Sequence, residues 1–423
     1  MYKFQLKTFP NGLRLLMVPS KESLSFQVMV LVNTGTDFES KNINGISHFL
    51  EHMCFKGTMK RPSNLAITQE LDRIGGAYNA FTGREYTGYY ARVSKNHKEL
   101  AIDIVSDIYL NSVFREEEIK KEKGVIIEEI NMYHDEPRSY IEELWDKLLY
   151  GNQPAGWPIA GTKENIQRIT RKDFLNYHKS QYRSSSTLIV ISGNFNNKEV
   201  ISLVKQYFLN ISRDKAKIKK KAQEKQRMPK VLLEQRKTDQ THIILGVRGI
   251  NLFDKRRYVL NVLDAVLGGG MSSHLFQLVR GKLGAAYYVD SLIESKTDTG
   301  YWAINAGLDS LRVETVIKAI IKEWQSFKTV LVGPREIKKA KDFLAGQIAL
   351  RFEDVHAVAS NYSVQLLLTN RIETLQQYLA RIRQVTPKDL RKVALDLLTP
   401  QFLNLALIGF HQNKTRIQKL LTI

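Results

Sequence analysis

Hydrophobic and polar residues follow two different periods along the chain, and these periods separate predicted strands from predicted helices. Short apolar runs predict strands at residues 26–32, 88–93 and 187–192. Segments in which apolar residues recur every three or four positions predict helices at residues 45–52, 97–110 and 116–131. The N-terminus alternates apolar and polar residues up to a turn at Pro10, Asn11 and Gly12, so we interpret it as a first strand rather than a signal or transit peptide. This order of elements predicts an α+β fold with helices packed on one face of a sheet.

The pattern occurs twice, which indicates a duplicated domain. Residues 88–91, 118–123 and 170–174 recur in the same order at residues 300–303, 336–341 and 386–390, always displaced by 212 to 218 positions. A chain of 423 residues suits two domains of about 200 residues each rather than one core. The segment between the copies is polar and strongly basic, and it is the natural hinge. The sequence therefore predicts a first domain at 1–211, a linker at 212–230 and a second domain at 231–423.

A candidate metal site lies near the start of the first copy. His48 and His52 are four residues apart, so a helix would place both imidazoles on one face. The side chain of Glu51, three residues after His48, reaches too short a distance to be an obvious third ligand. We interpret it as the base that accepts a proton from water. A hydrolytic zinc ion needs three protein ligands and one open position. A helical histidine pair is by itself more often solvated or hydrogen-bonded than metal-binding, so the context has to decide.

The third ligand has to come from elsewhere, and the segment 120–129 is the best candidate. Glu122 and Glu129 are seven residues apart, two turns along one helical face, and the apolar residues between them indicate a half-buried helix. The repeat tests this hypothesis from within the sequence. The positions that correspond to His48, Glu51, His52, Glu122 and Glu129 are Leu260, Leu263, Asp264, Ala340 and Gln347. The second copy thus lacks every candidate ligand, which favours chemistry confined to the first half.

Longer motifs give the chain a resemblance to a known family. His48 to His52 is the inverted zincin signature His-x-x-Glu-His, and it continues to Thr58. The other motifs follow in order: residues 79–85, residues 124–129, and residues 268–276 with Arg280 and Tyr287. In these motifs the chain resembles the insulinase and pitrilysin family of zinc peptidases. The resemblance is greatest to the half-length type that includes the catalytic beta subunit of mitochondrial processing peptidase and its bacterial relatives, and it covers essentially the whole chain.

The resemblance implies a role for each matching residue. His48, His52 and Glu129 would ligate one zinc ion per chain, Glu129 fitting the register better than its neighbour Glu128. Glu51 would be the general base, and Glu122 would orient a ligand imidazole. The substrate would add as a strand at an exposed sheet edge formed by Asn79, Ala80 and Phe81. Arg280 and Tyr287, or Tyr288 if the register slips by one residue, would reach the substrate and the developing oxyanion from the second half.

The resemblance also implies the architecture and the partners. Two similar α+β halves, each a mainly antiparallel sheet with helices on one face, would face each other as a clamshell. Half-length relatives are usually dimeric, so we expect a homodimer or a heterodimer with a related subunit. The expected substrate is an unfolded peptide or a presequence-like segment.

Composition limits the alternatives. The net charge of +20 raises the question of nucleic acid, but the basic residues are spread over the chain apart from one cluster at 213–230, and no nucleic-acid motif accompanies them. A linker and general solubility explain the charge better. No run approaches 18 apolar residues, so we expect no membrane span. The single cysteine, Cys54, excludes an internal disulfide framework and fits a reducing compartment, and we expect a bacterial cytoplasm.

Three hypotheses follow from the sequence. The first is an active zinc endopeptidase, in which Glu51 takes a proton from the attacking water and returns it to the leaving amine. The second is a non-catalytic core or peptide-binding subunit of the same fold, which normally has an eroded metal motif. The third is a basic protein that binds nucleic acid, and the net charge is the only feature of the sequence that supports it. The intact motif favours the first.

Overall fold

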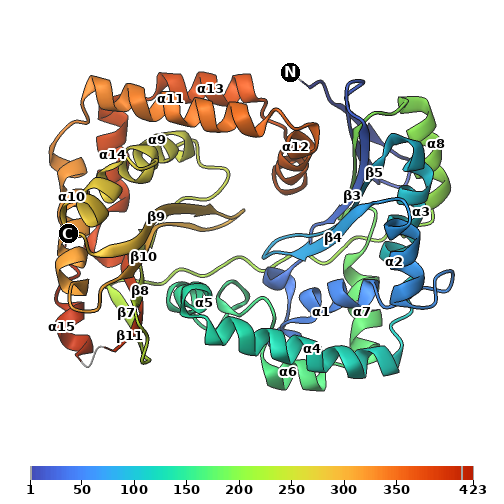
Figure 1. The fold of residues 1–423 in the computed structure, drawn as a ribbon, viewed down its shortest axis with the longest axis horizontal. Helices are drawn as coiled ribbons and strands as arrows, with labels where there is room; N and C mark the ends of the chain where they lie inside the picture. The colour runs from blue at the N-terminus through green and yellow to red at the C-terminus, as the bar shows by residue number, and fades with distance from the viewer. Residues whose placement is uncertain (1, 411–412, 423) are drawn as a thin grey trace. The chain divides into compact units, whose positions relative to one another are not determined.

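Each copy of the repeat forms one mainly antiparallel β-sheet with helices packed against it, as the α+β prediction requires (Figure 1). The computed structural model describes residues 2–410 and 413–422. The predicted strands and helices of the first copy are confirmed to within a few residues at their ends. The hydrophobic periods therefore specify the elements, whereas their packing depends on contacts distant in the sequence.

The first sheet has six strands in the order β1-β2-β6-β3-β5-β4, and β4 is an edge strand. Its strands are β1 (Gln5–Thr8), β2 (Arg14–Pro19), β3 (Ser25–Val32), β4 (Ala77–Thr82), β5 (Thr87–Ser94) and β6 (Thr187–Gly193). All neighbours are antiparallel except the parallel pair β2 and β6.

Among the described residues, the second sheet repeats this topology without a counterpart of β1. Its order is β7-β11-β8-β10-β9, with one parallel pair, β7 and β11, in the position of β2 and β6. Its strands are β7 (Lys230–Gln235), β8 (Thr241–Arg248), β9 (Ala286–Ser295), β10 (Gly300–Leu308) and β11 (Leu403–Gly409). The matched strand orders agree with the duplication that the sequence predicts.

The helices also come in matching sets. Those before the linker are α1 (Ile46–Cys54), α2 (Asn64–Asp72), α3 (Lys98–Leu110), α4 (Glu116–Asp135), α5 (Pro137–Tyr150), α6 (Lys163–Arg168), α7 (Arg171–Gln181) and α8 (Asn197–Phe208). Those after it are α9 (Arg257–Gly268), α10 (Val313–Thr329), α11 (Pro334–Arg351), α12 (Val355–Thr369), α13 (Leu375–Gln384), α14 (Pro387–Leu397) and α15 (Lys414–Gln418). In chain order α1, α3, α4, α5 and α7 correspond to α9, α10, α11, α12 and α14.

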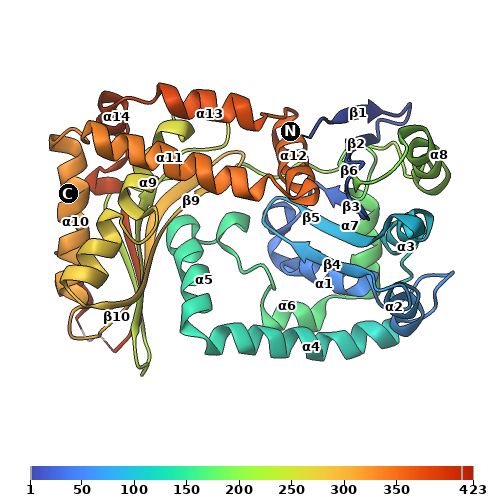
Figure 2. The ribbon, with the colours of Figure 1, turned by 45° about the horizontal axis from the view of Figure 1, so that its top comes forward.

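The sequence predicts helices on one face of each sheet, whereas in the structure the other face also carries a helix, which comes from the other copy. In the first sheet α1, α3 and α7 lie on one side of β3 and α12 lies on the other (Figure 2). Phe26, Val28 and Val30 of β3 pack into the core on the first side, whereas Met29 and Leu31 pack with α12. Burial on both sides explains why β3 is a nearly continuous apolar run. In the second sheet α5 packs against β8 and β11 in the same way.

This exchange sets the composition of the compact units. One unit contains residues 1–131, 157–220 and 351–372, and the other contains residues 132–156, 221–350 and 373–423. The units therefore do not coincide with the sequence segments 1–211 and 231–423. Two helix segments, 132–156 and 351–372, each pack with the sheet of the opposite copy, which no local pattern reveals.

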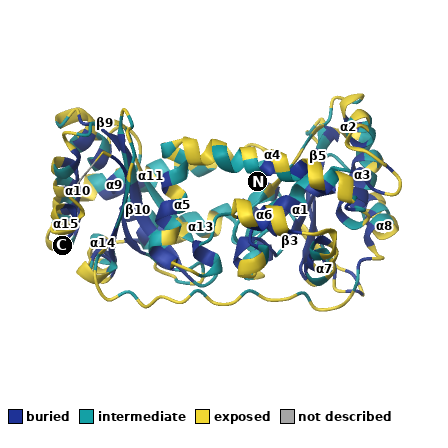
Figure 3. Cartoon of the chain, turned by 90° about the horizontal axis from the view of Figure 1, so that it is seen from below, coloured by how far each residue is buried: buried dark blue, intermediate teal, exposed yellow. Residues whose placement is uncertain are grey.

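The basic segment between the copies is extended and mostly exposed, and residues 212–229 form neither helix nor strand (Figure 3). Its first part is attached to the first unit, where the Lys219 ammonium lies 2.5 Å from the Glu85 carboxylate. Its second part is attached to the second unit, where Arg248 pairs with Glu224 at 3.0 Å. The linker thus makes contacts with both units, and its role as a hinge stays a prediction.

Helix α12 is held on the first sheet by a buried histidine. The Nε2 atom of His356 lies 2.8 Å from the hydroxyl of Ser25, and its Nδ1 atom lies 2.7 Å from the hydroxyl of Ser192. His356 is 4% exposed, and burial, reinforced by the charge of Arg92, lowers its pKa to about 4. The ring is therefore neutral when α12 is docked at neutral pH.

We expect this histidine to make folding pH-dependent. Below pH 6.5 the unfolded chain binds a proton at His356 that the folded chain does not bind, so stability falls as the pH falls from 6.5 toward 4. Between pH 7.5 and 5.0 the wild type should lose about 2 kcal/mol more unfolding free energy than His356→Gln. Urea unfolding of both proteins with a chelator present measures this difference. Equal losses in the two proteins would contradict it.

Candidate metal centre

Helix α1 presents one buried face and one face that carries the predicted metal-site residues. Ile46, Phe49, Leu50 and Met53 are at most 1% exposed and pack into the first core. The spacing of these residues turns His48, Glu51 and His52 to the opposite side, where all three are partly exposed. Burial of the apolar face thus fixes the direction in which the polar residues point.

The start of α1 is fixed by a buried carboxylate, Glu39. Its two oxygens accept hydrogen bonds from the backbone N–H groups of Gly45 and Ser47, both at 2.8 Å, and from the side chain of Asn44 at 2.9 Å. A carboxylate suits this place because the first turn of a helix leaves N–H groups unpaired and carries partial positive charge. Gly45 itself has φ of 97°, and a Cβ atom there would lie 2.6 Å from the carbonyl oxygen of Ala160.

Helix α4 supplies the carboxylates that the sequence predicts. Ile119 and Ile126 are buried, and they hold Glu122 and Glu129 toward α1. Val125 is one of the apolar residues between the two glutamates from which the sequence predicts a half-buried helix, but its side chain is 51% exposed. Glu128 is exposed and accepts a hydrogen bond from Asn131 at 3.3 Å, so the structure turns Glu129 rather than Glu128 toward the histidines.

His48, His52 and Glu129 converge on one point. The Nε2 atoms of both histidines lie 3.7 Å from Oε2 of Glu129, and the three potential ligand atoms lie within 4.8 Å of one another. The imidazole centroids are 4.6 Å apart. Nitrogen and oxygen ligands of tetrahedral zinc lie about 2.0–2.2 Å from the ion, so atoms about 3.5 Å apart can share it. The donor set and its spacing therefore fit a zinc ion.

The surroundings of His52 leave its Nε2 atom free for a metal. Glu122 is 4% exposed, and its Oε1 atom lies 2.9 Å from Nδ1 of His52. A carboxylate can only accept, so in the neutral ring Nδ1 carries the proton and Nε2 presents its lone pair. Burial acts to lower the pKa of His52, but the hydrogen bond and charge of Glu122, together with the charges of Glu129 and Glu51, outweigh it and raise that pKa. Burial also acts to raise the pKa of Glu122, but the hydrogen bonds to His52 and Lys56 outweigh it and lower that pKa.

His48 is in a more apolar place than His52. Burial, with a contribution from His52, lowers the pKa of His48 to about 4, so its imidazole is neutral at pH 7 as metal ligation requires. Within the described residues no group pairs with its buried Nδ1 atom.

Glu51 lies beside this group and is held by the edge strand β4. The hydroxyl of Thr82 donates a hydrogen bond of 2.6 Å to Oε2 of Glu51. Burial raises the pKa of Glu51, and the hydrogen bond from Thr82 opposes that shift. A carboxylate whose proton affinity is raised, next to a metal site, suits a general base.

The predicted substrate residues lie on the exposed edge of the first sheet. Strand β4 pairs with β5, and Asn79 and Phe81 alternate with the more buried Ala80 and Thr82. The Ala80 N–H donates to the side chain of Asn79 at 2.9 Å. Phe81 is 36% exposed and its ring lies over Gly88, where a Cβ atom would lie 2.3 Å from it. Because β4 is an edge strand, its outer side is a place where a further strand can be added.

The remaining predicted residues belong to the second unit. Arg280 lies exposed in the short π-helix Phe276–Lys282, its guanidinium 5.3 Å from the ring centroid of Phe276. Tyr287 on β9 is 63% exposed. Tyr288 is engaged, because its hydroxyl lies 3.0 Å from Nδ1 of His242 and Arg138 lies over its ring. Of the two tyrosines, Tyr287 therefore has the freer side chain, and its role and that of Arg280 stay predictions.

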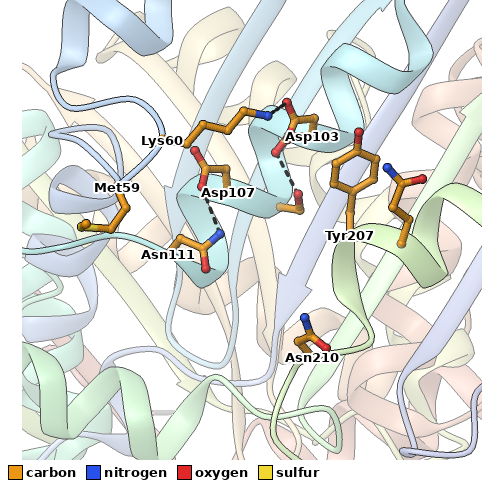
Figure 4. A pocket seen from close by; sticks show the side chains of 9 residues that line it. Met59, Lys60, Asp103, Asp107, Asn111, Tyr207 and Asn210 are labelled. Atoms are coloured by element: carbon orange, nitrogen blue, oxygen red, sulfur yellow. Dashed lines mark hydrogen bonds and ion pairs between the residues drawn. The ribbon is translucent and has the colours of Figure 1, made fainter.

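Two other features of the first unit do not contribute to the metal group. A cavity of about 420 Å³ is lined by Lys60, Asp103, Asp107 and Tyr207 among others, and it contains none of the predicted ligands (Figure 4). Cys54 is fully buried and donates weakly to the hydroxyl of Tyr89 at 3.6 Å, and burial raises its pKa to about 12. It is a small residue of the first core.

Comparisons with known families agree with this geometry. The model of the insulinase family, peptidase family M16, matches residues 16–163, and the model described as the peptidase M16 inactive domain matches residues 168–344. This chain belongs to the M16 peptidase family. The M16 relatives include the uncharacterized zinc protease YmxG of Bacillus subtilis, 35% identical over 403 residues that cover 95% of this chain and 97% of the relative. An uncharacterized zinc protease of Streptomyces coelicolor is 35% identical over 92% of this chain and 86% of its own.

Solved structures show the same M16 fold. A protease from Helicobacter pylori superposes with a TM-score of 0.89 at 21% identity, covering 97% of this chain and all of its own. A peptidase M16 inactive domain from Pseudomonas fluorescens superposes with a TM-score of 0.89 at 16% identity, covering 98% of this chain and all of its own. Family membership supports a protease role, and the names of the bacterial relatives imply zinc. None of the described helices has the length and apolar character needed to cross a bilayer.

Proposed function

We propose that this protein is a zinc-dependent endopeptidase that cleaves unfolded peptides or presequence-like segments. The observation that carries the proposal is the convergence of His48, His52 and Glu129, beside which Thr82 holds the carboxylate of Glu51 outside the three-residue group. The three converging residues would hold one zinc ion per chain. When bound, that ion supplies a Lewis acid that polarises a carbonyl and lowers the pKa of water.

The protein's own groups supply the proton transfers and the positioning. Glu51 accepts the proton of the attacking water and returns it to the leaving amine. Thr82 fixes the orientation of the Glu51 carboxylate. Strand β4 holds the peptide through main-chain hydrogen bonds, so the sequence of the substrate matters less than its extended form. Arg280 and Tyr287 are proposed as donors to the oxyanion on the strength of the family motifs alone.

A quenched-fluorescence peptide library tests the proposal. We expect cleavage by the purified chain, loss of cleavage with a zinc chelator, and recovery when zinc is restored. A chain that binds zinc but cleaves no peptide would instead be a non-catalytic subunit of the same fold.

The location and the assembly are part of the same proposal. The relatives in Bacillus, Streptomyces and Mycobacterium are bacterial, and together with the single cysteine they support a bacterial cytoplasm. A homodimer, or a heterodimer with a related subunit, is proposed from the family resemblance. Light scattering of the purified chain measures its assembly state.

Thr82 provides a specific test of how Glu51 is positioned. Thr82→Val keeps the shape of β4 but removes the 2.6 Å hydrogen bond to Glu51, and a hydrogen bond to a charged group contributes about 1.5–3 kcal/mol. We expect kcat for a quenched peptide to fall at least about tenfold with little change in KM. Thr82→Ser, which keeps the hydroxyl, is the matched control and should stay near the wild type. Equal losses in both variants would contradict the role of the hydroxyl.

A further inference from the structure

Lys56 lies just after helix α1 and contacts the buried carboxylate that supports the metal group. Its Nζ atom lies 2.6 Å from Oε2 of Glu122, while Oε1 of the same carboxylate lies 2.9 Å from Nδ1 of His52. The Lys56 side chain is 24% exposed and that of Glu122 is 5% exposed. The two oxygens of Glu122 therefore have different partners, a cation on one side and an imidazole on the other.

The backbone that carries Lys56 is held in one conformation. The N–H groups of Phe55 and Lys56 donate to the carbonyls of His52 and Met53, each at 3.1 Å, and close the end of α1. Gly57 follows with φ of 130°, a region that other residues rarely adopt. A Cβ atom at Gly57 would lie 2.8 Å from the carbonyl oxygen of Pro62. The backbone from which the Lys56 side chain reaches Glu122 is thus fixed by the fold.

Charge and geometry give this contact a consequence for His52. A buried carboxylate needs partners for its charge, and removing one partner leaves the other contact strained or the charge uncompensated. If Lys56 did not hold Oε2, the Glu122 carboxylate could turn away from Nδ1 of His52. A group that hydrogen-bonds to a metal-binding histidine fixes the tautomer and the direction of its imidazole.

We propose that Lys56 is a positioning residue of the metal centre, which acts through Glu122 to hold His52 in the tautomer and orientation that binds zinc. The proposal rests on the proposed function for the metal itself, but it concerns a residue that the family motifs gave no role. The alternative is a purely structural role, in which the ion pair of Lys56 and Glu122 only joins the end of α1 to α4.

Zinc affinity, measured on the full chain by competition with a chromophoric chelator, tests the proposal without using activity. We expect Lys56→Met to weaken zinc binding about tenfold, the lower end of the range for groups that support a metal ligand. Lys56→Arg keeps the charge and should stay within about threefold of the wild type. Lys60→Met is the matched control, because Lys60 also pairs with a carboxylate, Asp103 at 2.5 Å, but away from the metal group, and it should leave zinc affinity unchanged.

A double-mutant cycle shows whether Lys56 acts through Glu122. We expect Lys56→Met to have no further effect on zinc affinity in a Glu122→Gln background. Independent, additive losses would overturn the proposal. Wild-type zinc affinity in Lys56→Met, together with a lower unfolding free energy of the zinc-free form, would also overturn it, because the ion pair would then be structural only.

Two controls keep the outcomes distinct. If Lys56→Met does not fold, as judged by circular dichroism of the zinc-free chain, Lys56→Gln replaces it under the same criteria. If the wild type itself binds no zinc, the proposed function fails and this inference fails with it. Tight zinc binding by the wild type combined with unchanged affinity in the Lys56 variants removes the inference alone.

Discussion

Glu51→Gln is expected to abolish peptide cleavage while leaving zinc bound. Glutamine has nearly the same shape as glutamate, and its amide oxygen can still accept the hydrogen bond from Thr82, so the site should keep its structure. It cannot take a proton from water, and general base catalysis is worth about 10²–10⁴-fold in rate. We expect kcat to fall by about three orders of magnitude or more, which corresponds to at least about 4 kcal/mol of barrier.

The measurement for Glu51→Gln combines steady-state cleavage of a quenched peptide with the zinc content of the same sample. Zinc content equal to that of the wild type shows that the ligands are intact. Full turnover by Glu51→Gln would reject the role of Glu51 as the base. Loss of zinc together with activity would place Glu51 among the ligands instead.

Glu129→Gln and Glu128→Gln are expected to have opposite outcomes, although the two residues are neighbours. The carboxylate of Glu129 lies 3.7 Å from both Nε2 atoms, so removing its charge should cost more zinc affinity than the 10–100-fold loss typical of groups outside the ligand set. Cleavage should be lost with the metal. Glu128 is exposed and contacts Asn131, so Glu128→Gln should keep both zinc and activity.

Chelator competition and peptide cleavage, run in parallel on both variants, decide this comparison. The pair is matched because each change removes one negative charge from the same turn of α4. Equal behaviour of the two variants would contradict the assignment of Glu129. The reverse order of effects would transfer the ligand role to Glu128.

The sequence predicts the helices and strands, and the face of α1 that carries the histidines, because both depend on the spacing of apolar residues close together in the chain. The spacing of His48 and His52 places them on one helical face once α1 forms, and the burial of Phe49 and Leu50 turns that face outward from the core. The same reasoning selects the α4 segment, because Glu122 and Glu129 share one face of it. In the second copy the residue equivalent to His52 is Asp264. It accepts a hydrogen bond from the indole of Trp302 at 2.7 Å.

The contacts that the sequence does not reveal join residues far apart in the chain. The motif that contains Thr82 suggests a substrate strand, but its hydrogen bond to Glu51 depends on how β4 packs against α1. Lys56 follows His52 by four residues, yet its partner Glu122 lies on another helix. The exchange of α5 and α12 between the copies is equally invisible, because each helix has an ordinary amphipathic or apolar pattern that does not specify which sheet it covers.

Diffraction from a crystal grown with zinc, recorded at the zinc absorption edge, tests the central claim most directly. The account predicts one strong anomalous peak within about 2.0–2.2 Å of His48, His52 and Glu129. A zinc-loaded crystal with no peak at these residues, or with its peak bound elsewhere, would contradict it.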